Sequence, residues 1–161
     1  MGSRAVVAGF DGGTITSDVG ALLLRVVETT RGIISRFAAC FTHLRDERYV
    51  EHSVPSMVAQ RVYGLCLGYE DVLDHGQLRE DPLIATLCKQ ADAEGRRGRR
   101  RRDRGRPLVA KSELNRLETG VPAVSRYKQI GGDESAIGRT FVEVFLSSLE
   151  SAPQQIVLDL D

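Results

Sequence analysis

The sequence lacks tryptophan altogether, has few aromatic residues (6%) and contains only three cysteines in 161 positions. The cysteines, Cys40, Cys66 and Cys88, lie far apart and form no Cys-x-x-Cys pair, which argues against a zinc site or a disulfide framework. Their odd number and the absence of a secretory signal at the N-terminus favour a reducing, cytoplasmic location. No apolar run approaches the length of a membrane span, so we expect no membrane partner.

A net charge is also lacking, because 22 basic residues balance 22 acidic ones, but the charges are unevenly distributed. Residues 96–106 hold eight arginines against one acid, Asp103, so they carry +7 and the rest of the chain carries −7. Guanidinium groups bind phosphates bidentately and release counterions, so this segment is typical of an arm that contacts DNA phosphates. The candidate DNA-binding residues are Arg96, Arg97, Arg99, Arg100, Arg101, Arg102, Arg104 and Arg106. A solvated linker is the alternative, since no aromatic residue offers base stacking here.

The overall composition, 42% hydrophobic and 27% charged, is typical of a globular protein. Local patterns divide the chain into four segments. Residues 1–90 predict a helical region with a short strand at 5–10, and residues 91–106 a flexible, disordered or extended loop. Residues 107–150 predict a further helical segment, and residues 151–161 a terminal strand. Apolar spacing and capping residues predict helices within residues 18–32, 33–43, 53–68, 72–78, 81–87, 112–118 and 133–150.

The terminal strand carries the candidate catalytic residues. Four of the last six residues are apolar, and Asp159 and Asp161 are two positions apart, so on a strand they share one face. A carboxylate at the end of a buried strand can bind a divalent cation for phosphoryl transfer. A frayed, charged terminus is the alternative explanation of the same residues.

Six stretches are informative when they are taken together and in order along the chain. They are residues Thr16 to Arg25, His43 to Asp46, Gln60 to Asp71, Leu78 to Pro82, Leu114 to Glu118 and Val157 to Asp161. Together they resemble one group of bacterial insertion-sequence transposases of the DDE type, whose catalytic domain has a ribonuclease-H-like fold. The expected fold class is therefore mainly α with a short N-terminal strand, followed by the first strand of a truncated α/β ribonuclease-H-like domain.

The resemblance implies metal-dependent cleavage and transfer of DNA strands, with Mg²⁺ or Mn²⁺ as the cofactor. By register, Asp161 matches the first acid of the catalytic triad and the metal ligand, and Asp159 is the second choice. The second Asp and the Glu of the family pattern, and the Thr that follows the first acid, have no counterpart in the sequence. We therefore expect the N-terminal portion of a transposase that is inactive alone and binds no metal stably.

The implied partners are the DNA of the element's terminal repeats and, in an oligomer, a second copy or a full-length transposase. The expected location is the cytoplasm, in association with the nucleoid. Two other interpretations stay open at this point. The chain is either a non-catalytic, DNA-binding or dimerising product that represses transposition, or a decayed gene product with no role.

Overall fold

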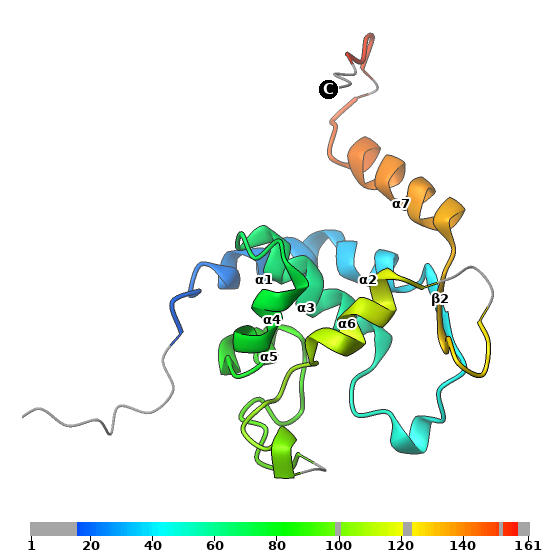
Figure 1. Cartoon of the computed structure of the whole chain (residues 1–161). Coiled ribbons are helices and arrows are strands. Elements are labelled where there is room, and N and C mark those ends of the chain that lie inside the picture. The colour runs from blue at the N-terminus through cyan, green and yellow to red at the C-terminus, as the bar shows by residue number, and fades with distance from the viewer. Residues whose placement is uncertain (1–15, 99–100, 121–123, 152, 158–161) are drawn as a thin grey trace, which may run out of the picture.

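The computed structural model describes residues 16–98, 101–120, 124–151 and 153–157, and it is mainly helical, as expected (Figure 1). Its helices are α1 (Ala21–Arg31), α2 (Ile33–Ala38), α3 (Val54–Cys66), α4 (His75–Leu78), α5 (Pro82–Leu87), α6 (Lys111–Glu118) and α7 (Glu134–Ser147). Three short 3₁₀ turns, η1 (Glu47–Tyr49), η2 (Val72–Asp74) and η3 (Arg101–Asp103), and two strands, β1 (Phe41–His43) and β2 (Ile130–Gly132), complete it. The expected strand at residues 5–10 lies outside the described residues.

Local capping residues set several helix boundaries where the sequence predicts them. The Ser53 side chain accepts a hydrogen bond from the Ser56 amide at the start of α3. Asp81 caps α5 and Asp133 caps α7 in the same way, because a short side-chain oxygen satisfies an amide that the first turn leaves unpaired. Gly32 ends α1 in the left-handed region, at φ 62°, which a glycine adopts without strain.

The two strands correct the prediction for residues 33–43 and 130–132. The expected helix ends at Ala38, and Phe41–His43 instead pair antiparallel with Ile130–Gly132, which lie in the segment predicted to be helical. Gly132 faces Phe41, and a Cβ at this position would lie 3.2 Å from the Phe41 ring. The missing side chain therefore lets β2 approach β1 closely. This long-range contact cannot be predicted from a local sequence pattern.

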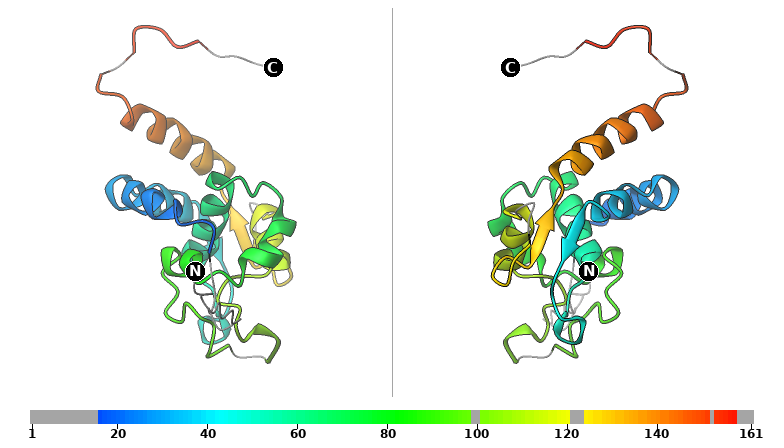
Figure 2. Two further views of the ribbon diagram at one scale, coloured as in Figure 1. Left: turned by 90° about the vertical axis from the view of Figure 1, so that its left-hand side faces the viewer. Right: turned by 90° about the vertical axis from the view of Figure 1, so that its right-hand side faces the viewer.

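The core lies around α3, where α2, α5 and α6 meet it and α1 packs against α5 (Figures 1 and 2). Its largest fully buried apolar side chains are Tyr63, Met57, Ile84, Leu108, Leu114 and Val109. Cys40 and Cys88 are buried too, and burial raises the pKa of the Cys88 thiol to about 12. Cys88 is thus a protonated core residue at neutral pH.

A polar network crosses this core. The Gln60 side chain is fully buried, receives a hydrogen bond from the Val109 amide (2.9 Å) and donates one to the Val109 carbonyl (3.1 Å). Its amide nitrogen also lies 3.2 Å from Nδ1 of His75, which is fully buried as well. The network therefore ties the chain that leaves the arginine-rich segment to α3 and α4.

Replacing Gly64 with Ala tests the packing beside this network. A Cβ on Gly64 would lie 2.7 Å from Cε1 of His75, so we expect the free energy of unfolding to fall by about 1–3 kcal/mol. Gly76 is the matched control, because a Cβ there meets nothing within 4 Å and Ala favours a helix. Urea unfolding of both variants measures the difference. Equal midpoints for Gly64→Ala and the wild type would contradict the packing described.

Helix α7 extends away from the other helices, as both views of Figure 2 show. It is held to α2 by the edge-to-face rings of Phe37 and Phe141 and by an ion pair between Arg36 and Glu143 (2.9 Å). Much of its predicted apolar face is consequently exposed, with Phe141 62% and Phe145 46% accessible. The apolar residues of α1 are exposed in the same way, apart from Ala21 and the partly covered Leu24.

The terminal strand is not found in the part of residues 151–161 that the structure describes. Residues 153–157 have no strand conformation, and α7 ends at Ser147, close to the predicted end at residue 150. Asp159 and Asp161 lie outside the described residues, so their placement stays a prediction.

Candidate nucleic-acid interface

The arginine-rich segment forms a closed loop in its described part, which differs from the disordered or extended loop expected from composition. The Gly105 amide donates a hydrogen bond to the Gly95 carbonyl (3.0 Å), so the two ends of the loop meet. Both glycines have a positive φ, 65° and 74°, and a Cβ on Gly95 would lie 2.6 Å from the Arg106 amide. Glycine at these two positions therefore permits a closure that the charge of the loop alone would oppose.

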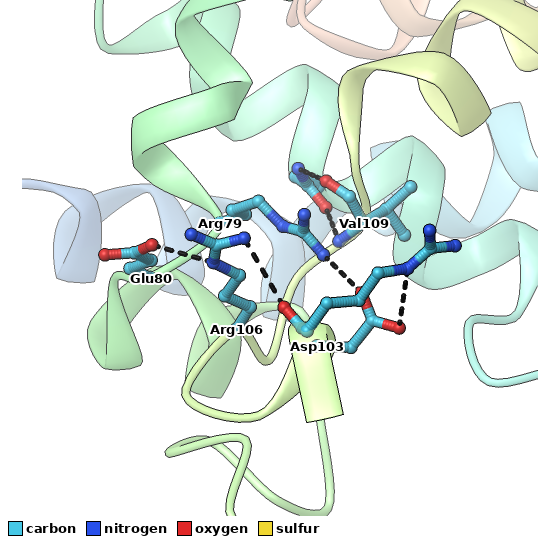
Figure 3. A network of polar contacts seen from close by, with 7 residues as sticks. Arg79, Glu80, Asp103, Arg106 and Val109 are labelled. Carbon is cyan, nitrogen blue, oxygen red and sulfur yellow. Dashed lines mark hydrogen bonds and ion pairs between the residues drawn. The ribbon is translucent and has the colours of Figure 1, made fainter. Parts of the chain in front are cut away.

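Acidic residues anchor the loop to the helical body (Figure 3). Asp103 in η3 accepts from Arg79 (3.3 Å) and lies 3.9 Å from Arg102, and both Arg79 and Asp103 are largely buried. Arg106 donates to Glu80 (2.9 Å), which immediately follows Arg79. These contacts place the exposed arginines of the loop beside the turn that follows α4.

The eight arginines predicted to bind DNA consequently fall into three groups. Arg96, Arg102 and Arg106 each contact an acid, namely Glu94, Asp103 and Glu80. The exposed side chains of Arg97, Arg101 and Arg104 make no ion pair with any other described residue. Arg99 and Arg100 lie outside the described residues. The second group is therefore the one whose charge is available to a partner.

A pocket of about 760 Å³ adjoins the loop, between the segment around η1, the loop itself, α6 and the chain before β2. Its cationic lining residues are Arg45, Arg79, Arg102, Arg106, Arg116 and Lys128. Its acidic lining residues are Asp46, Glu51, Asp103 and Glu113, so cations outnumber acids. Tyr127, which is 92% exposed, stands at the lining as an aromatic surface.

Most of these pocket cations could not be predicted as site residues from the sequence. Arg102 and Arg106 belong to the conspicuous arginine run, whereas Arg45, Arg79, Arg116 and Lys128 are scattered along the chain among ordinary polar residues. Only the fold brings them to one pocket. The sole hint in the sequence is that Arg45, Arg79 and Arg116 fall within three of the six stretches that carry the family resemblance.

Arg45 and His52, which both line the pocket, contact each other. Arg45 Nη1 donates to the His52 carbonyl (3.1 Å) and contacts the Met57 sulfur (3.7 Å). Burial lowers the pKa of Arg45, an effect that the Glu113 carboxylate opposes, but a guanidinium stays protonated in proteins. Burial also lowers the pKa of His52, against the opposing charge of Glu113, so the imidazole is neutral at pH 7.

The two buried histidines predict how stability depends on pH. Burial lowers the folded-state pKa of both His52 and His75 below the ordinary value of 6.5, and Arg61 lowers that of His75 further. As the pH falls through about 6.5, the unfolded chain binds protons that the folded chain does not. The free energy of unfolding is therefore expected to decrease from about pH 7 to about pH 5.

Urea unfolding at the two pH values measures this decrease in the wild type and in His52→Gln. The variant removes one of the two groups, so its midpoint should change less between the two pH values. A wild-type midpoint that stays constant or rises on acidification would show that the histidines are not buried as described.

No described group of three or more His, Cys, Asp or Glu residues is suited to hold a metal ion. The dense polar stretch around residues 43–52 does not form one, because Asp46 caps η1 and pairs with Arg48 (2.7 Å). Asp159 and Asp161, the predicted catalytic and metal-binding residues, are outside the described part of the chain. The described residues therefore offer no site that fits Mg²⁺ or Mn²⁺.

Within the described residues, no helix has the length and apolarity needed to cross a lipid bilayer. A family model described as Transposase DDE domain group 1 matches residues 1–161. No curated protein and no solved structure matches the chain. The family match agrees with the resemblance found from the six sequence stretches.

Proposed function

The chain belongs to the transposase DDE domain group 1 family, and from this premise we propose that it binds DNA in the transposition of an insertion sequence. The family implies DNA as the partner. The observation that carries the proposal is the closed arginine loop, which presents Arg97, Arg101 and Arg104 without competing ion pairs among the described residues. Unpaired guanidinium groups bind phosphates more readily than groups already held by carboxylates.

The anchoring of the loop supports the same proposal. A loop tied at Gly95 and Gly105, and held by Asp103 and Arg106, orders its arginines before DNA arrives. Less conformational entropy is then lost on binding than for a disordered arm. Phosphate contacts of this kind give affinity and salt dependence rather than sequence specificity. Any recognition of the terminal repeats needs further contacts.

For the chemistry, we propose that Asp161 is the first acid of the catalytic triad, with Asp159 as the second choice. Enzymes of this family generally use a divalent metal ion, which would stabilise the attacking and leaving oxygens of a phosphodiester. The family pattern requires a second Asp and a Glu that these 161 residues do not match. We therefore expect the purified chain to bind DNA but not to cut it.

A cleavage assay tests this expectation. Duplex DNA that carries the element's ends is incubated with the chain in Mg²⁺ or Mn²⁺, and no strand cleavage is expected above the level of an Asp161→Ala variant. Metal-dependent cleavage that Asp161→Ala abolishes would overturn the proposed lack of activity while supporting the assignment of Asp161.

A repressor is the second candidate function. The described part of the loop presents unpaired arginines for DNA, and the second Asp and the Glu of the family pattern have no counterpart in the sequence, which is the combination expected of a non-catalytic competitor. Such a chain should reduce strand transfer by a full-length transposase when both are added to the same element ends. An unchanged rate at saturating DNA occupancy would exclude this role.

A further inference from the structure

Most of the buried polar atoms that lack a partner in the described chain belong to residues that line the pocket beside the arginine loop. Six buried side-chain nitrogen or oxygen atoms have no hydrogen-bond partner among the described residues, and four of them belong to residues that line this pocket. These four are Nε and Nη2 of Arg45, Nε of Arg79 and Nδ1 of His52. Buried polar groups in folded proteins are nearly always paired, so this concentration in one place points to a bound partner.

The chemistry of these atoms restricts the ligand. The three guanidinium atoms are donors only, so their partner must be an acceptor. Nε and Nη2 of Arg45 form one edge of the guanidinium fork, which matches two oxygens of a single oxyanion. Arg45 has no carboxylate partner within 4.0 Å among the described residues, because its bonds go to the His52 carbonyl and the Met57 sulfur.

The surroundings favour an oxyanion as well. Arg79 is oriented by Asp103, which accepts from its Nη2, while its Nε stays unpaired (Figure 3). Arg116 and Lys128 also line the pocket, and neither forms an ion pair with another described residue. The pocket acids compete for these charges but leave an excess of cations.

We propose that this pocket binds one phosphate group, with the Arg45 edge and Arg79 Nε as its donors. Phosphate is favoured over a carboxylate because it offers more acceptor oxygens and more charge to several converging cations. The anion site itself rests on the pocket geometry. Its assignment to a phosphate of DNA rests on the proposed function, since the pocket is continuous with Arg102 and Arg106 of the arginine loop.

The test follows the arginine Nε–H signals of the wild-type chain by NMR while inorganic phosphate is added at constant ionic strength. The signals of Arg45 and Arg79 are expected to shift together and to saturate, and acetate at equal ionic strength should shift them less. Arg45→Gln should weaken the affinity for phosphate by about tenfold or more, as expected for lost hydrogen bonds to a charged ligand. Arg45→Lys keeps the charge but loses the forked guanidinium, so its affinity for phosphate should lie between those of the wild type and Arg45→Gln.

Arg48→Gln is the matched control, because Arg48 is nearby, exposed and absent from the pocket lining, so its affinity for phosphate should equal that of the wild type. Absence of a saturable shift, or equal shifts with acetate, would overturn the phosphate site and show that these donors are hydrated or bind any anion. The wild-type titration decides this even if Arg45→Gln fails to fold.

Two DNA duplexes of one sequence, one with 5′-phosphates and one with 5′-hydroxyls, identify the source of the phosphate. Tighter binding of the 5′-phosphorylated duplex that depends on Arg45 would assign a terminal phosphate. Equal binding that depends on Arg45 would assign a backbone phosphate. If inorganic phosphate binds but neither duplex does, the site stands and the proposed DNA-binding function fails. If the duplexes bind independently of Arg45 and phosphate shifts no signal, only the phosphate site fails.

Discussion

Replacing Gln60 with Met is expected to lower the free energy of unfolding by about 3–5 kcal/mol, a large fraction of the stability of an ordinary domain. Met has nearly the same length but cannot accept from the Val109 amide or donate to its carbonyl. It also removes the polar partner of His75 Nδ1, and all three groups lie in the core. A buried group left without its partner costs more than the bond itself contributed.

Urea unfolding followed by circular dichroism measures this loss. Gln77→Met in α4 is the matched control, since Gln77 is exposed and its replacement should change stability by less than about 0.5 kcal/mol. Equal stability of the two variants would mean that the Gln60 network does not hold the core. The network matters for function because Val109 lies three residues after Arg106, where the arginine loop ends. Loss of the Gln60 hydrogen bonds should therefore also loosen this loop.

The second large effect is expected on DNA affinity. Changing Arg97, Arg101 and Arg104 together to Gln should weaken binding to a duplex by on the order of a hundredfold at about 0.1 M salt, because each lost cation releases one fewer counterion. These three side chains make no ion pair with another described residue, so the fold should not change. Fluorescence anisotropy with a labelled duplex gives the affinity, and circular dichroism confirms folding.

The control removes the same amount of charge from helices outside the arginine loop. Arg31, Arg36 and Arg139 lie on α1, α2 and α7, far from η3 in Figure 1, and are changed to Gln together. The control loses the Arg36–Glu143 ion pair and the hydrogen bond from Arg31 to the Ser147 carbonyl, so circular dichroism must show that it stays folded. A loss of affinity as large as that of the loop variant would show that only net charge matters and that the loop has no special role.

The helix boundaries could be predicted because their signals are local. Ser53, Asp81 and Asp133 each cap a helix through amides two or three residues away, and Gly32 ends α1 through its own backbone conformation. The strand pair could not be predicted in this way. Phe41 and Gly132 pair across most of the chain, each strand has three residues, and the pairing overrides the helical spacing that continues from α2.

The candidate site also combines a local feature, which could be predicted, with a long-range one, which could not. The arginine run is a local feature and was visible as a charge excess, although its closure through Gly95 and Gly105 was not. The pocket is a non-local feature, since Arg45, Arg79 and Arg116 come from three separate parts of the chain. Single arginines carry no periodicity that marks them as neighbours, so their convergence follows only from the packing of α6 against α3 and the contact of Arg45 with Met57 of α3.

The central claim is that the arginine loop of this transposase-family chain contacts DNA phosphates, and the salt dependence of duplex binding tests it most directly. The logarithm of the association constant, plotted against the logarithm of the salt concentration, should be linear and steeply negative for the wild type. The slope should become shallower by about 3 in the Arg97, Arg101 and Arg104 variant and stay unchanged in the α1, α2 and α7 control. A wild-type affinity that does not depend on salt, or identical slopes in all three proteins, would contradict the account.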